Sequence, residues 1–275
     1  MTEKVAIQGI KGSFHHQVAQ EYYGNEVEVD ECSSFQAVVD SLLSETAERA
    51  VMAIENSIAG SILPNYALID ENGLRIIGEH YIPVYMNLMA LPGQRVEEIK
   101  KVYSHPMALL QCKEFFKNFP KIKLIEDTDT AGAARRIAKK GSHGSAAVAS
   151  KAASQIFGLE ILSEGIHTIK SNATRFLILS TQKNCPNGYK IDKASLKFVM
   201  ESKQGSLVSV LNIIRDYDLD MTKIQSVPVI ETPWKYAFFI DVIFEDLEKF
   251  TKAMEILEVM TEQLKVLGTY KNSLI

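Results

Sequence analysis

The stretch Asn172-Ala173-Thr174-Arg175-Phe176 runs into the apolar residues 176–179, which have the composition of a buried strand. It places a hydroxyl and a guanidinium next to each other in the chain. Arginine is the side chain best suited to hold a carboxylate through two parallel hydrogen bonds. A neighbouring hydroxyl can donate a hydrogen bond or a proton to a molecule held there. Thr-Arg pairs are common, so this stretch gains meaning only from the rest of the chain.

The composition is that of an ordinary folded protein, since 46% of the 275 residues are apolar and 23% are charged. This length fits two or three compact units. The net charge of −4 argues against a nucleic acid as the main partner, because nucleic-acid binding usually needs a basic face. No apolar run approaches the roughly 18 residues of a membrane helix, and no signal-peptide pattern is present. We therefore expect a cytoplasmic protein that does not contact a membrane.

The three cysteines, Cys32, Cys112 and Cys185, are odd in number and far apart. Without a Cys-x-x-Cys pair they predict neither a zinc site nor a disulfide framework. Reduced thiols agree with a cytoplasmic location. The sequence offers no metal site and no cofactor site.

Short apolar runs alternate with amphipathic helical patterns through the first part of the chain. Strands are predicted at 5–7, 27–29, 50–54, 101–103, 122–126, 146–149 and 175–180, and helices at 14–23, 33–43, 107–118, 130–140 and from about 150 to 157. Such alternation indicates a parallel sheet covered by helices on both faces. Residues 74–91 interrupt it as extended chain. Two runs of alternation joined in this way predict two α/β lobes with a cleft between them.

The pattern changes after a polar segment, residues 182–189, which contains Pro and Asn-Gly and is the predicted linker. Strands are predicted at 194–200, 221–230, 234–244 and 263–270, with helices at 205–217 and 247–260. This β-α-β-β-α-β order is typical of the ferredoxin-like fold.

Three more motifs accompany the opening stretch: Gly12-Ser13-Phe14, then residues 55–60 (Glu-Asn-Ser-Ile-Ala-Gly), then residues 104–112 (Ser-His-Pro-Met-Ala-Leu-Leu-Gln-Cys). In this order and at these spacings, the set resembles the prephenate dehydratase family over essentially the whole chain. The resemblance implies a catalytic domain, 1–182, of the type II periplasmic-binding-protein kind. Its lobes would be 1–80 with 165–182, and 81–164. Residues 190–275 resemble an ACT domain, a small module that senses amino acids.

The activity that the resemblance implies is a decarboxylating dehydration. Prephenate loses its ring hydroxyl as water and its ring carboxylate as carbon dioxide, which gives phenylpyruvate for phenylalanine biosynthesis. Such a lyase has to grip a dianion and protonate a poor leaving group. No metal or electron sink is needed for this step.

The resemblance assigns the catalytic positions to Thr174, Arg175, Ser13 and Asn56. Thr174 would be the general acid, a role that typically accelerates a reaction about 10²–10⁴-fold. Arg175 would bind a carboxylate. The competing interpretations are a threonine that satisfies backbone groups at a strand entrance and a surface arginine at a strand edge.

The remaining substrate contacts fall mainly where strands end and helices begin, which is where α/β proteins place ligand-binding loops. The predicted positions are Gly12, Ser57, Gly60, Ser104, His105, Gln111, Thr130 and Phe176. Several have structural alternatives. Ser13 fits a helix cap, His105 fits a loop contact, and Thr128 or Asp129 can cap the helix that starts near Thr130.

One position departs from the family pattern. Family members usually carry Ser or Thr directly after Phe14, where this chain has His15. Two alternatives follow: a neutral His15 replaces the missing hydroxyl, or its side chain faces solvent.

The C-terminal part has a predicted effector site. Gly205, Ser206 and Leu207 match the turn by which the family's ACT domain holds phenylalanine, and Gln225 and Ser226 lie in its second signature. That signature is incomplete, because Gln225 and Val227 stand where Glu and Arg are usual, and Asp220 stands where Asn is usual. Regulation by L-phenylalanine is therefore a hypothesis. The open edges of the predicted sheet favour a homodimer or homotetramer.

Two alternatives to prephenate dehydratase activity remain open. Arogenate dehydratase differs only in its substrate, which carries an amino group in place of the keto group. A non-catalytic sensor for amino acids or carboxylates would use the same two lobes and the same small domain. The Thr174–Arg175 pair favours the enzyme, because a pure binder needs no proton donor there.

Overall fold

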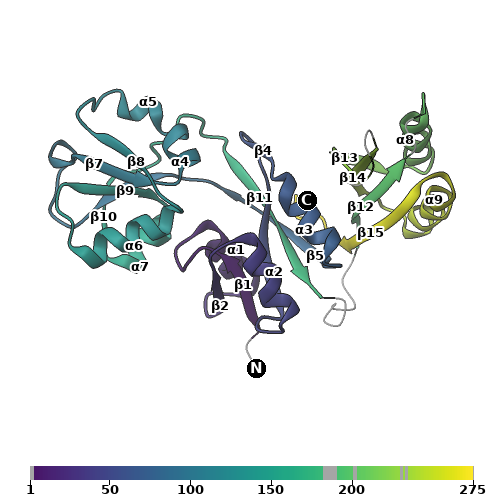
Figure 1. The fold of residues 1–275 in the computed structure, drawn as a ribbon, viewed down its shortest axis with the longest axis horizontal. Coiled ribbons are helices and arrows are strands. Elements are labelled where there is room, and N and C mark those ends of the chain that lie inside the picture. The colour runs from purple at the N-terminus through teal and green to yellow at the C-terminus, as the bar shows by residue number, and fades with distance from the viewer. Residues whose placement is uncertain (1–2, 182–190, 201–202, 230–231, 233–234, 275) are drawn as a thin grey trace. The chain divides into compact units, whose positions relative to one another are not determined.

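The computed structural model describes residues 3–181, 191–200, 203–229, 232 and 235–274. The helices in these residues are α1 (Phe14–Tyr23), α2 (Phe35–Leu43), α3 (Leu63–Glu71), the 3₁₀ turn η1 (Val96–Glu98), α4 (Pro106–Gln111), α5 (Lys113–Phe116), α6 (Thr130–Lys140), α7 (Lys151–Phe157), α8 (Ser206–Asp216) and α9 (Leu247–Met260). The strands are β1 (Lys4–Gln8), β2 (Glu28–Cys32), β3 (Arg49–Asn56), β4 (Gly60–Ser61), β5 (Arg75–Pro83), β6 (Asn87–Ala90), β7 (Lys101–Ser104), β8 (Lys123–Glu126), β9 (Ser145–Ala149), β10 (Glu160–Ser163), β11 (Ala173–Ser180), β12 (Lys193–Met200), β13 (Asp220–Pro228), β14 (Tyr236–Ile243) and β15 (Glu262–Tyr270). They form three sheets (Figure 1).

The first sheet has the strand order β2-β1-β3-β11-β5, and β4 pairs with β3. β1 runs parallel to β2 and β3, because α1 and α2 supply the crossovers that parallel strands need. Both helices start at serines, since Ser13 accepts a hydrogen bond from the backbone N–H of His16 and Ser34 from that of Ala37. The predicted α/β character of this part is confirmed.

The second sheet has the order β10-β6-β9-β7-β8 and is mixed. β7 runs parallel to β8 and β9, whereas β6 runs antiparallel to β9 and β10. The expectation of a wholly parallel sheet is therefore wrong for this part. β6 runs antiparallel because it follows the extended chain of residues 74–91 and enters the sheet without a preceding helix.

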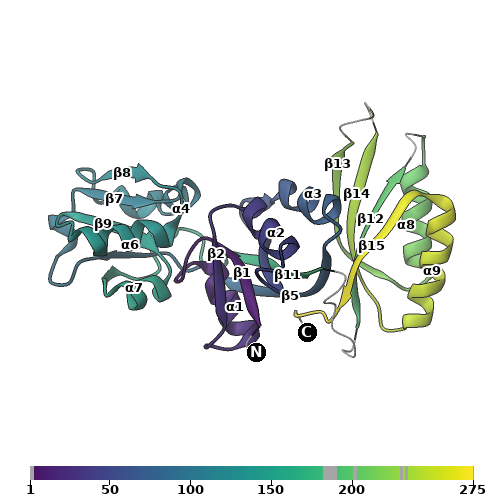
Figure 2. The same ribbon diagram turned by 60° about the horizontal axis from the view of Figure 1, so that its bottom comes forward.

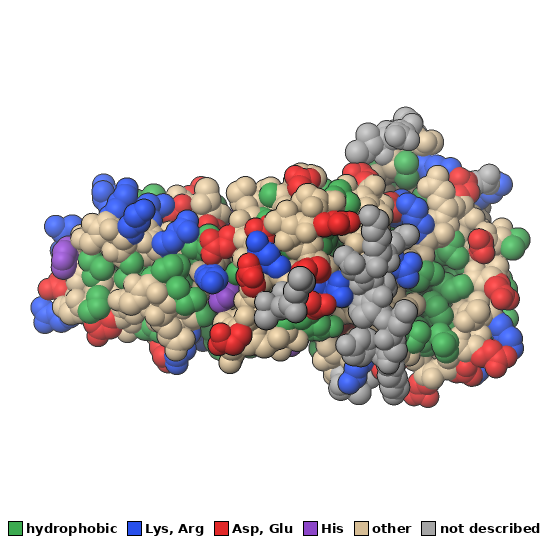
Figure 3. Space-filling model, turned by 90° about the horizontal axis from the view of Figure 1, so that it is seen from below, with side chains coloured by type: hydrophobic (Ala, Val, Ile, Leu, Met, Phe, Trp, Pro, Cys, Tyr) green, Lys and Arg blue, Asp and Glu red, His purple; other side chains and the backbone are tan. Residues whose placement is uncertain are grey.

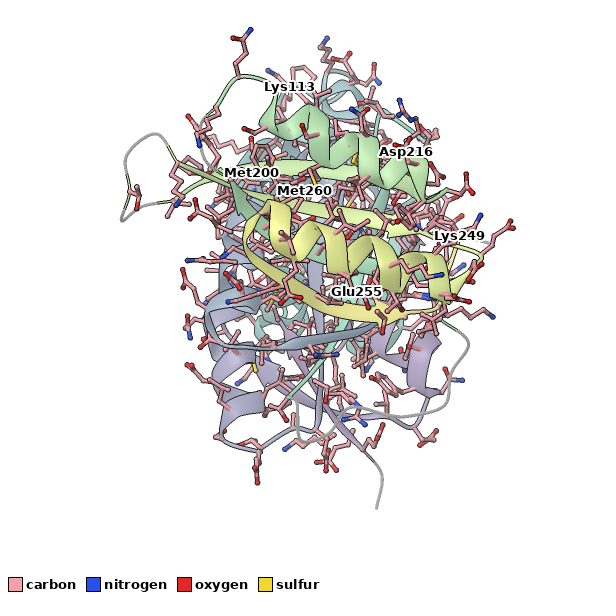
Figure 4. All side chains as sticks on the ribbon, turned by 90° about the vertical axis from the view of Figure 1, so that its right-hand side faces the viewer. Lys113, Met200, Asp216, Lys249, Glu255 and Met260 are labelled. Carbon is pink, nitrogen blue, oxygen red and sulfur yellow. The ribbon has the colours of Figure 1, made fainter. Side chains whose placement is uncertain are left out.

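The third sheet has the order β13-β14-β12-β15, and all its pairs are antiparallel. Together with α8 and α9 this is the predicted ferredoxin-like arrangement, which is confirmed. Figure 2 shows both helices on one face of the sheet, and in Figure 4 they lie side by side, with Met260 at one end of α9. The core under them includes alternate residues of β12, namely Ala194, Leu196, Phe198 and Met200.

The opposite face of the third sheet packs on α3 and β5. The intervening residues of β12 point there, as the period of two in a strand requires. Lys193 pairs with Glu79 on β5 at 2.9 Å, and Lys197 pairs with Asp70 on α3. This face is therefore closed by a helix and a strand from much earlier in the chain.

The described residues form two compact units, one within 1–61 and 81–176 and the other within 62–80 and 177–275. The predicted linker, 182–189, lies outside the described residues, and so do Ile230 and Trp234 at the ends of two predicted strands. The domain limits at 182 and 190 stay a prediction.

Two helices differ from the prediction. α3 was not foreseen, because its apolar residues are not confined to one stripe along the helix. The predicted helix 107–118 is split at Cys112, whose backbone leaves the helical region at φ −100° and ψ 5°. Among the described helices, none has both the length and the apolar character that a membrane crossing requires.

Acidic and basic side chains are interspersed over the face of the molecule that Figure 3 shows. This pattern agrees with the small net charge of −4.

Candidate active site

Asn56, at the end of β3, is the centre of a hydrogen-bond network. Its Nδ2 donates to Asn172 Oδ1 at 2.7 Å and to Thr174 Oγ1 at 2.9 Å. Its Oδ1 accepts from the backbone N–H groups of Ile58 and Ala59 at 3.1 and 3.0 Å. The Asn56 side chain therefore fixes both its own loop and the start of β11.

The network continues into the motif at residues 104–112 and includes a second residue of the motif at 55–60. Asn172 Nδ2 donates to Gln111 Oε1 at 3.0 Å, at the C-terminal end of α4. Ser57 Oγ accepts from the backbone N–H of Ala173 at 3.0 Å. We refer to Asn56, Ser57, Gln111, Asn172 and Thr174 as the Asn56 cluster. These residues come from three separate stretches of the sequence, and the fold brings them together.

Thr174 is held in this cluster as a hydrogen-bond acceptor. Its side chain is 8% exposed, and its Oγ1 receives the Asn56 amide hydrogen. A hydroxyl that accepts one hydrogen bond keeps its own hydrogen for another partner. Accepting a bond also strengthens the same group as a donor. The arrangement therefore suits a proton donor whose direction is fixed by Asn56.

Arg175 lies elsewhere. Both Thr174 and Arg175 belong to β11, and successive side chains of a strand point to opposite faces. The Arg175 guanidinium lies 5.9 Å from the centre of the Tyr81 ring, and the side chain is buried. The two neighbours in sequence therefore do not face the same space, and a carboxylate held by Arg175 would lie on the other face of the strand.

The Gly12-Ser13 turn is fixed against α7. Gly12 has φ +90°, and a Cβ there would lie 3.0 Å from Ala153 Cα. Its carbonyl accepts from Ser150 Oγ at 2.6 Å. Ser13 Oγ accepts from the backbone N–H of His16 at 3.2 Å. Ser13 therefore caps α1, which is the structural alternative given for it above.

His15 does not face solvent, so that alternative is wrong. The side chain is 8% exposed, and its Nε2 accepts from the backbone N–H of Ala53 at 3.3 Å. The ring packs edge-on against Phe176 at 5.0 Å. Burial lowers the pKa of His15 to about 3, so the ring is neutral at physiological pH. His15 and Phe176 therefore act as packing partners in this structure.

The predicted positions in the second sheet are spread out. Ser104 has no exposed surface, and its Oγ donates to the carbonyl of Val148 at 2.6 Å, which joins β7 to β9. His105 is exposed and caps α4 by accepting from Met107 N–H at 3.3 Å. Asp129 caps α6, so Thr130 is its first residue. We therefore find a structural contact for Ser104 and a capping contact for His105.

The sequence profile of the prephenate dehydratase family matches residues 5–184. The chain belongs to the prephenate dehydratase family. A bifunctional chorismate mutase/prephenate dehydratase of Aquifex aeolicus is 34% identical over 99% of this chain and 74% of its own length. An arogenate dehydratase/prephenate dehydratase of Arabidopsis thaliana is 33% identical over 97% of this chain and 72% of its own length.

The fold of the family is shared over the whole chain. A crystal structure of prephenate dehydratase from Arthrobacter aurescens, in complex with L-Phe, superposes with a TM-score of 0.88. It is 22% identical and covers 98% of this chain and 90% of that chain. The expected architecture, two α/β sheets followed by an antiparallel sheet with two helices, is confirmed.

The residues predicted for a family effector site come from α8 and β13. Gly205 precedes α8 at φ +84°, a conformation that favours glycine. Ser206 Oγ donates to the carbonyl of Lys203 at 3.0 Å, and Leu207 packs against the core of the third sheet. Gln225 Nε2 donates to the carbonyl of its neighbour Ser226 at 3.0 Å. The backbone N–H of Ser206 donates to the same carbonyl of Lys203 at 3.2 Å, which closes the turn before α8.

Sequence reasoning missed a cavity of about 660 Å³ in the first unit. Its walls include Phe14, Pro83, Tyr85, Lys151, His167 and Lys170. Phe14 is the only one of these six that belongs to a family motif quoted above. The other five lie in extended connections or on α7, where the alternation of strands and helices gave no functional signal.

Proposed function

We propose that the chain converts prephenate to phenylpyruvate, water and carbon dioxide, with Thr174 as the proton donor. Membership of the prephenate dehydratase family supports the reaction class. The observation that supports the donor is the Asn56 cluster, in which the Asn56 amide fixes Thr174 Oγ1 at 2.9 Å.

The reaction needs one proton and no external electrons. The bond between the ring and its hydroxyl breaks, and the leaving oxygen takes the Thr174 proton to become water. The bond between the ring and its carboxylate breaks at the same time, so carbon dioxide leaves and its bonding electrons complete the aromatic ring. Thr174 then recovers a proton from solvent. Because a free threonine hydroxyl is a very weak acid, its proton moves only as the leaving bond breaks.

Replacement of the hydroxyl tests this assignment. Thr174→Val keeps the shape of the side chain and removes the donor. Turnover should fall about 10²-fold or more, because general acid catalysis contributes about 10²–10⁴-fold. The measurement is phenylpyruvate formation from prephenate, with Thr46→Val on an exposed loop as the matched control. Equal turnover by Thr174→Val and the parent would overturn the role of Thr174.

The same assay decides the substrate when L-arogenate is run beside prephenate. Turnover of arogenate alone would keep the mechanism and change the substrate to the amino compound. Turnover of neither would favour the non-catalytic sensor. Prephenate is the substrate we propose, since the matched profile is that of prephenate dehydratase.

We also propose that L-phenylalanine binds the C-terminal domain at Gly205–Leu207 with Gln225 and Ser226. The L-Phe complex of the Arthrobacter aurescens protein supports this through its shared fold. Isothermal titration of the full chain should show binding at millimolar ligand, and the absence of heat would reject it. The catalytic domain at 1–182, the ACT domain at 190–275 and a cytoplasmic location complete this proposal.

A further inference from the structure

Asn172 is the one member of the Asn56 cluster without a predicted role. It is 1% exposed, and its backbone carbonyl accepts from the backbone N–H of Val84 at 2.8 Å. Its side chain is engaged at both ends of the amide. Oδ1 accepts from Asn56 Nδ2 at 2.7 Å, and Nδ2 donates to Gln111 Oε1 at 3.0 Å. We refer to Asn56, Asn172 and Gln111 as the amide row.

The direction of the first amide in this row, that of Asn56, is set by backbone groups at both its ends. Its Oδ1 accepts from the N–H groups of Ile58 and Ala59, which can only donate. Its Nδ2 donates to the carbonyl of Ala173 at 3.2 Å, which can only accept. A reversed Asn56 amide would meet all three groups with the wrong atom, so its direction is fixed.

This direction passes along the amide row. Because Asn56 presents its N–H to Asn172, Asn172 has to face it with Oδ1, which leaves Nδ2 for Gln111. Gln111 then has to face Asn172 with Oε1, so its Nε2 is the outer end of the row. Among the residues that the structure describes, Gln111 Nε2 has no hydrogen-bond partner. The side chain is partly exposed, and its Nε2 is not enclosed by protein.

The position of Gln111 is fixed by its backbone at the C-terminal end of α4. Its carbonyl accepts from the N–H and from the Oγ1 of Thr168, at 2.9 and 3.0 Å. Rotation of the terminal amide by half a turn would therefore exchange a donor for an acceptor at the same place. An outward N–H attracts an oxygen acceptor, whereas an outward carbonyl oxygen repels it.

We propose that Asn172 is a positioning residue for the substrate: it makes Gln111 present its Nε2 donor, rather than its oxygen, to an oxygen of the bound molecule. The proposal rests on the proposed function, because the carboxylates and the keto group of prephenate supply such oxygens. Asn172 does not touch the substrate and acts only through Gln111. The loop N–H groups that hold Asn56 thus also set the polarity of a substrate contact on α4.

Asn172→Asp reverses Gln111 without removing its partner. One carboxylate oxygen still accepts from Asn56, so Asn56 continues to hold Thr174. The other oxygen faces Gln111, whose Nε2 turns inward to donate to it and whose Oε1 turns outward. We expect KM for prephenate to rise about tenfold or more, as loss of a hydrogen bond to a charged group implies, whereas kcat stays within about threefold of the parent. An unchanged KM would contradict the proposal.

A double-mutant cycle separates this effect from that of the added charge, since a negative charge near a dianion raises KM by itself. Gln111→Met removes the amide, keeps the length of the side chain and should raise KM about tenfold. Adding Asn172→Asp to Gln111→Met should change KM by less than about threefold, because no amide is left to reverse. A further rise as large as in the parent background would assign the effect to charge and overturn the proposal. Asn118→Asp, at an exposed position after α5, is the matched control and should leave both constants unchanged.

The direction of the Gln111 amide can also be measured without turnover, by NMR of the side-chain amide hydrogens. The signals of Gln111 are those that disappear in Gln111→Met. In the parent they should exchange rapidly with water, because Nε2 faces outward. In Asn172→Asp the hydrogen bonded to the carboxylate should exchange at least about tenfold more slowly.

The two measurements distinguish failure of this proposal from failure of the proposed function. Equal exchange in the parent and Asn172→Asp would overturn the positioning role of Asn172, even when the parent converts prephenate. Slower exchange in Asn172→Asp, together with a parent that does not convert prephenate, would refute the proposed function and still support the control of Gln111 by Asn172.

Discussion

At the scale of single residues, Asn56 has two separate tasks, one for each end of its amide. The oxygen accepts from two backbone N–H groups of its own loop, and the nitrogen donates to Asn172 and Thr174. A substitution that changes only one end can therefore separate the loop from the proton donor.

Asn56→Asp makes this separation. The carboxylate keeps both acceptor contacts with the loop and replaces the donor by an oxygen that repels Thr174 Oγ1 and Asn172 Oδ1. We expect kcat to fall about tenfold or more, in line with the loss of a directed hydrogen bond. The melting temperature should change little. Kinetics on prephenate and a thermal melt provide the two readings, and unchanged kcat would show that Asn56 does not position Thr174.

His15 gives a prediction for stability at low pH. Its folded pKa is about 3, against 6.5 for an ordinary histidine, because burial disfavours the charged ring. The unfolded chain therefore binds a proton below about pH 6.5 that the folded chain does not bind. The contribution of neutral His15 to the free energy of unfolding is fully present above pH 6.5. It is lost as the pH falls towards 3, by up to about 1.4 kcal/mol per pH unit.

His15→Gln supplies an acceptor for Ala53 N–H that does not titrate. Urea unfolding of parent and variant between about pH 7.5 and pH 4.5 should show a smaller loss of unfolding free energy in the variant. Parallel pH profiles for the two proteins would mean that His15 is not the group responsible.

The sequence could group several of the predicted site residues, but it could not give the directions of their side chains. Motif spacing was enough to group Asn56, Gln111 and Thr174, which the fold does bring together. The sequence did not show that the side chains of Thr174 and Arg175 lie on opposite faces of a strand. The strand was predicted to start at Arg175, whereas it starts at Ala173. A two-residue error at a strand end decides whether neighbouring side chains share a loop or point to opposite faces.

At the scale of elements, α3 and β5 close the face of the third sheet that α8 and α9 leave open. Part of this contact is a backbone approach, since a Cβ on Gly268 of β15 would lie 1.9 Å from the carbonyl oxygen of Ile76. Another part is polar, because Lys193 and Glu79 are almost fully buried and form an ion pair at 2.9 Å. Sequence patterns did not foresee this packing, as α3 has no single apolar stripe and residues 74–80 appeared only as extended chain.

The Lys193–Glu79 pair should be costly to break from one side. Lys193→Met leaves a buried carboxylate without its cation, so we expect a loss of about 3–5 kcal/mol in the free energy of unfolding. Adding Glu79→Gln should recover part of that loss, because the uncompensated charge disappears. Lys235→Met, which breaks a more exposed ion pair with Glu262, is the matched control and should cost about 1 kcal/mol or less. Chemical denaturation measures all four proteins, and equal losses for Lys193→Met and Lys235→Met would contradict the argument.

At the scale of the whole molecule, the order of sheets was predictable because each has its own periodicity. Short apolar strands between helices gave the first two sheets, and alternating strands in a β-α-β-β-α-β order gave the third. Segments that pack with a different sheet or unit from their neighbours in sequence were not predictable. β6 joins the second sheet antiparallel, and residues 62–80 group with the C-terminal unit, although both come from the first half of the chain.

The third sheet also bears on how copies of the chain associate. β13 and β15 are its edge strands, and edges of open sheets tend to pair with a second copy. Ile224 on β13 is 41% exposed, which is high for an isoleucine in a strand. We therefore expect a homodimer or homotetramer in solution that uses the β13 edge.

Light scattering tests this expectation directly. The parent should have a mass of two or four times 30.7 kDa. Ile224→Lys places a charge at the β13 edge and should shift the protein towards the monomer, since like charges facing each other across a symmetric interface repel. Val208→Lys on α8, whose valine is 58% exposed, is the matched control and should leave the mass unchanged. A monomer mass for the parent would refute the oligomer, and a parent-like mass for Ile224→Lys would place the interface away from β13.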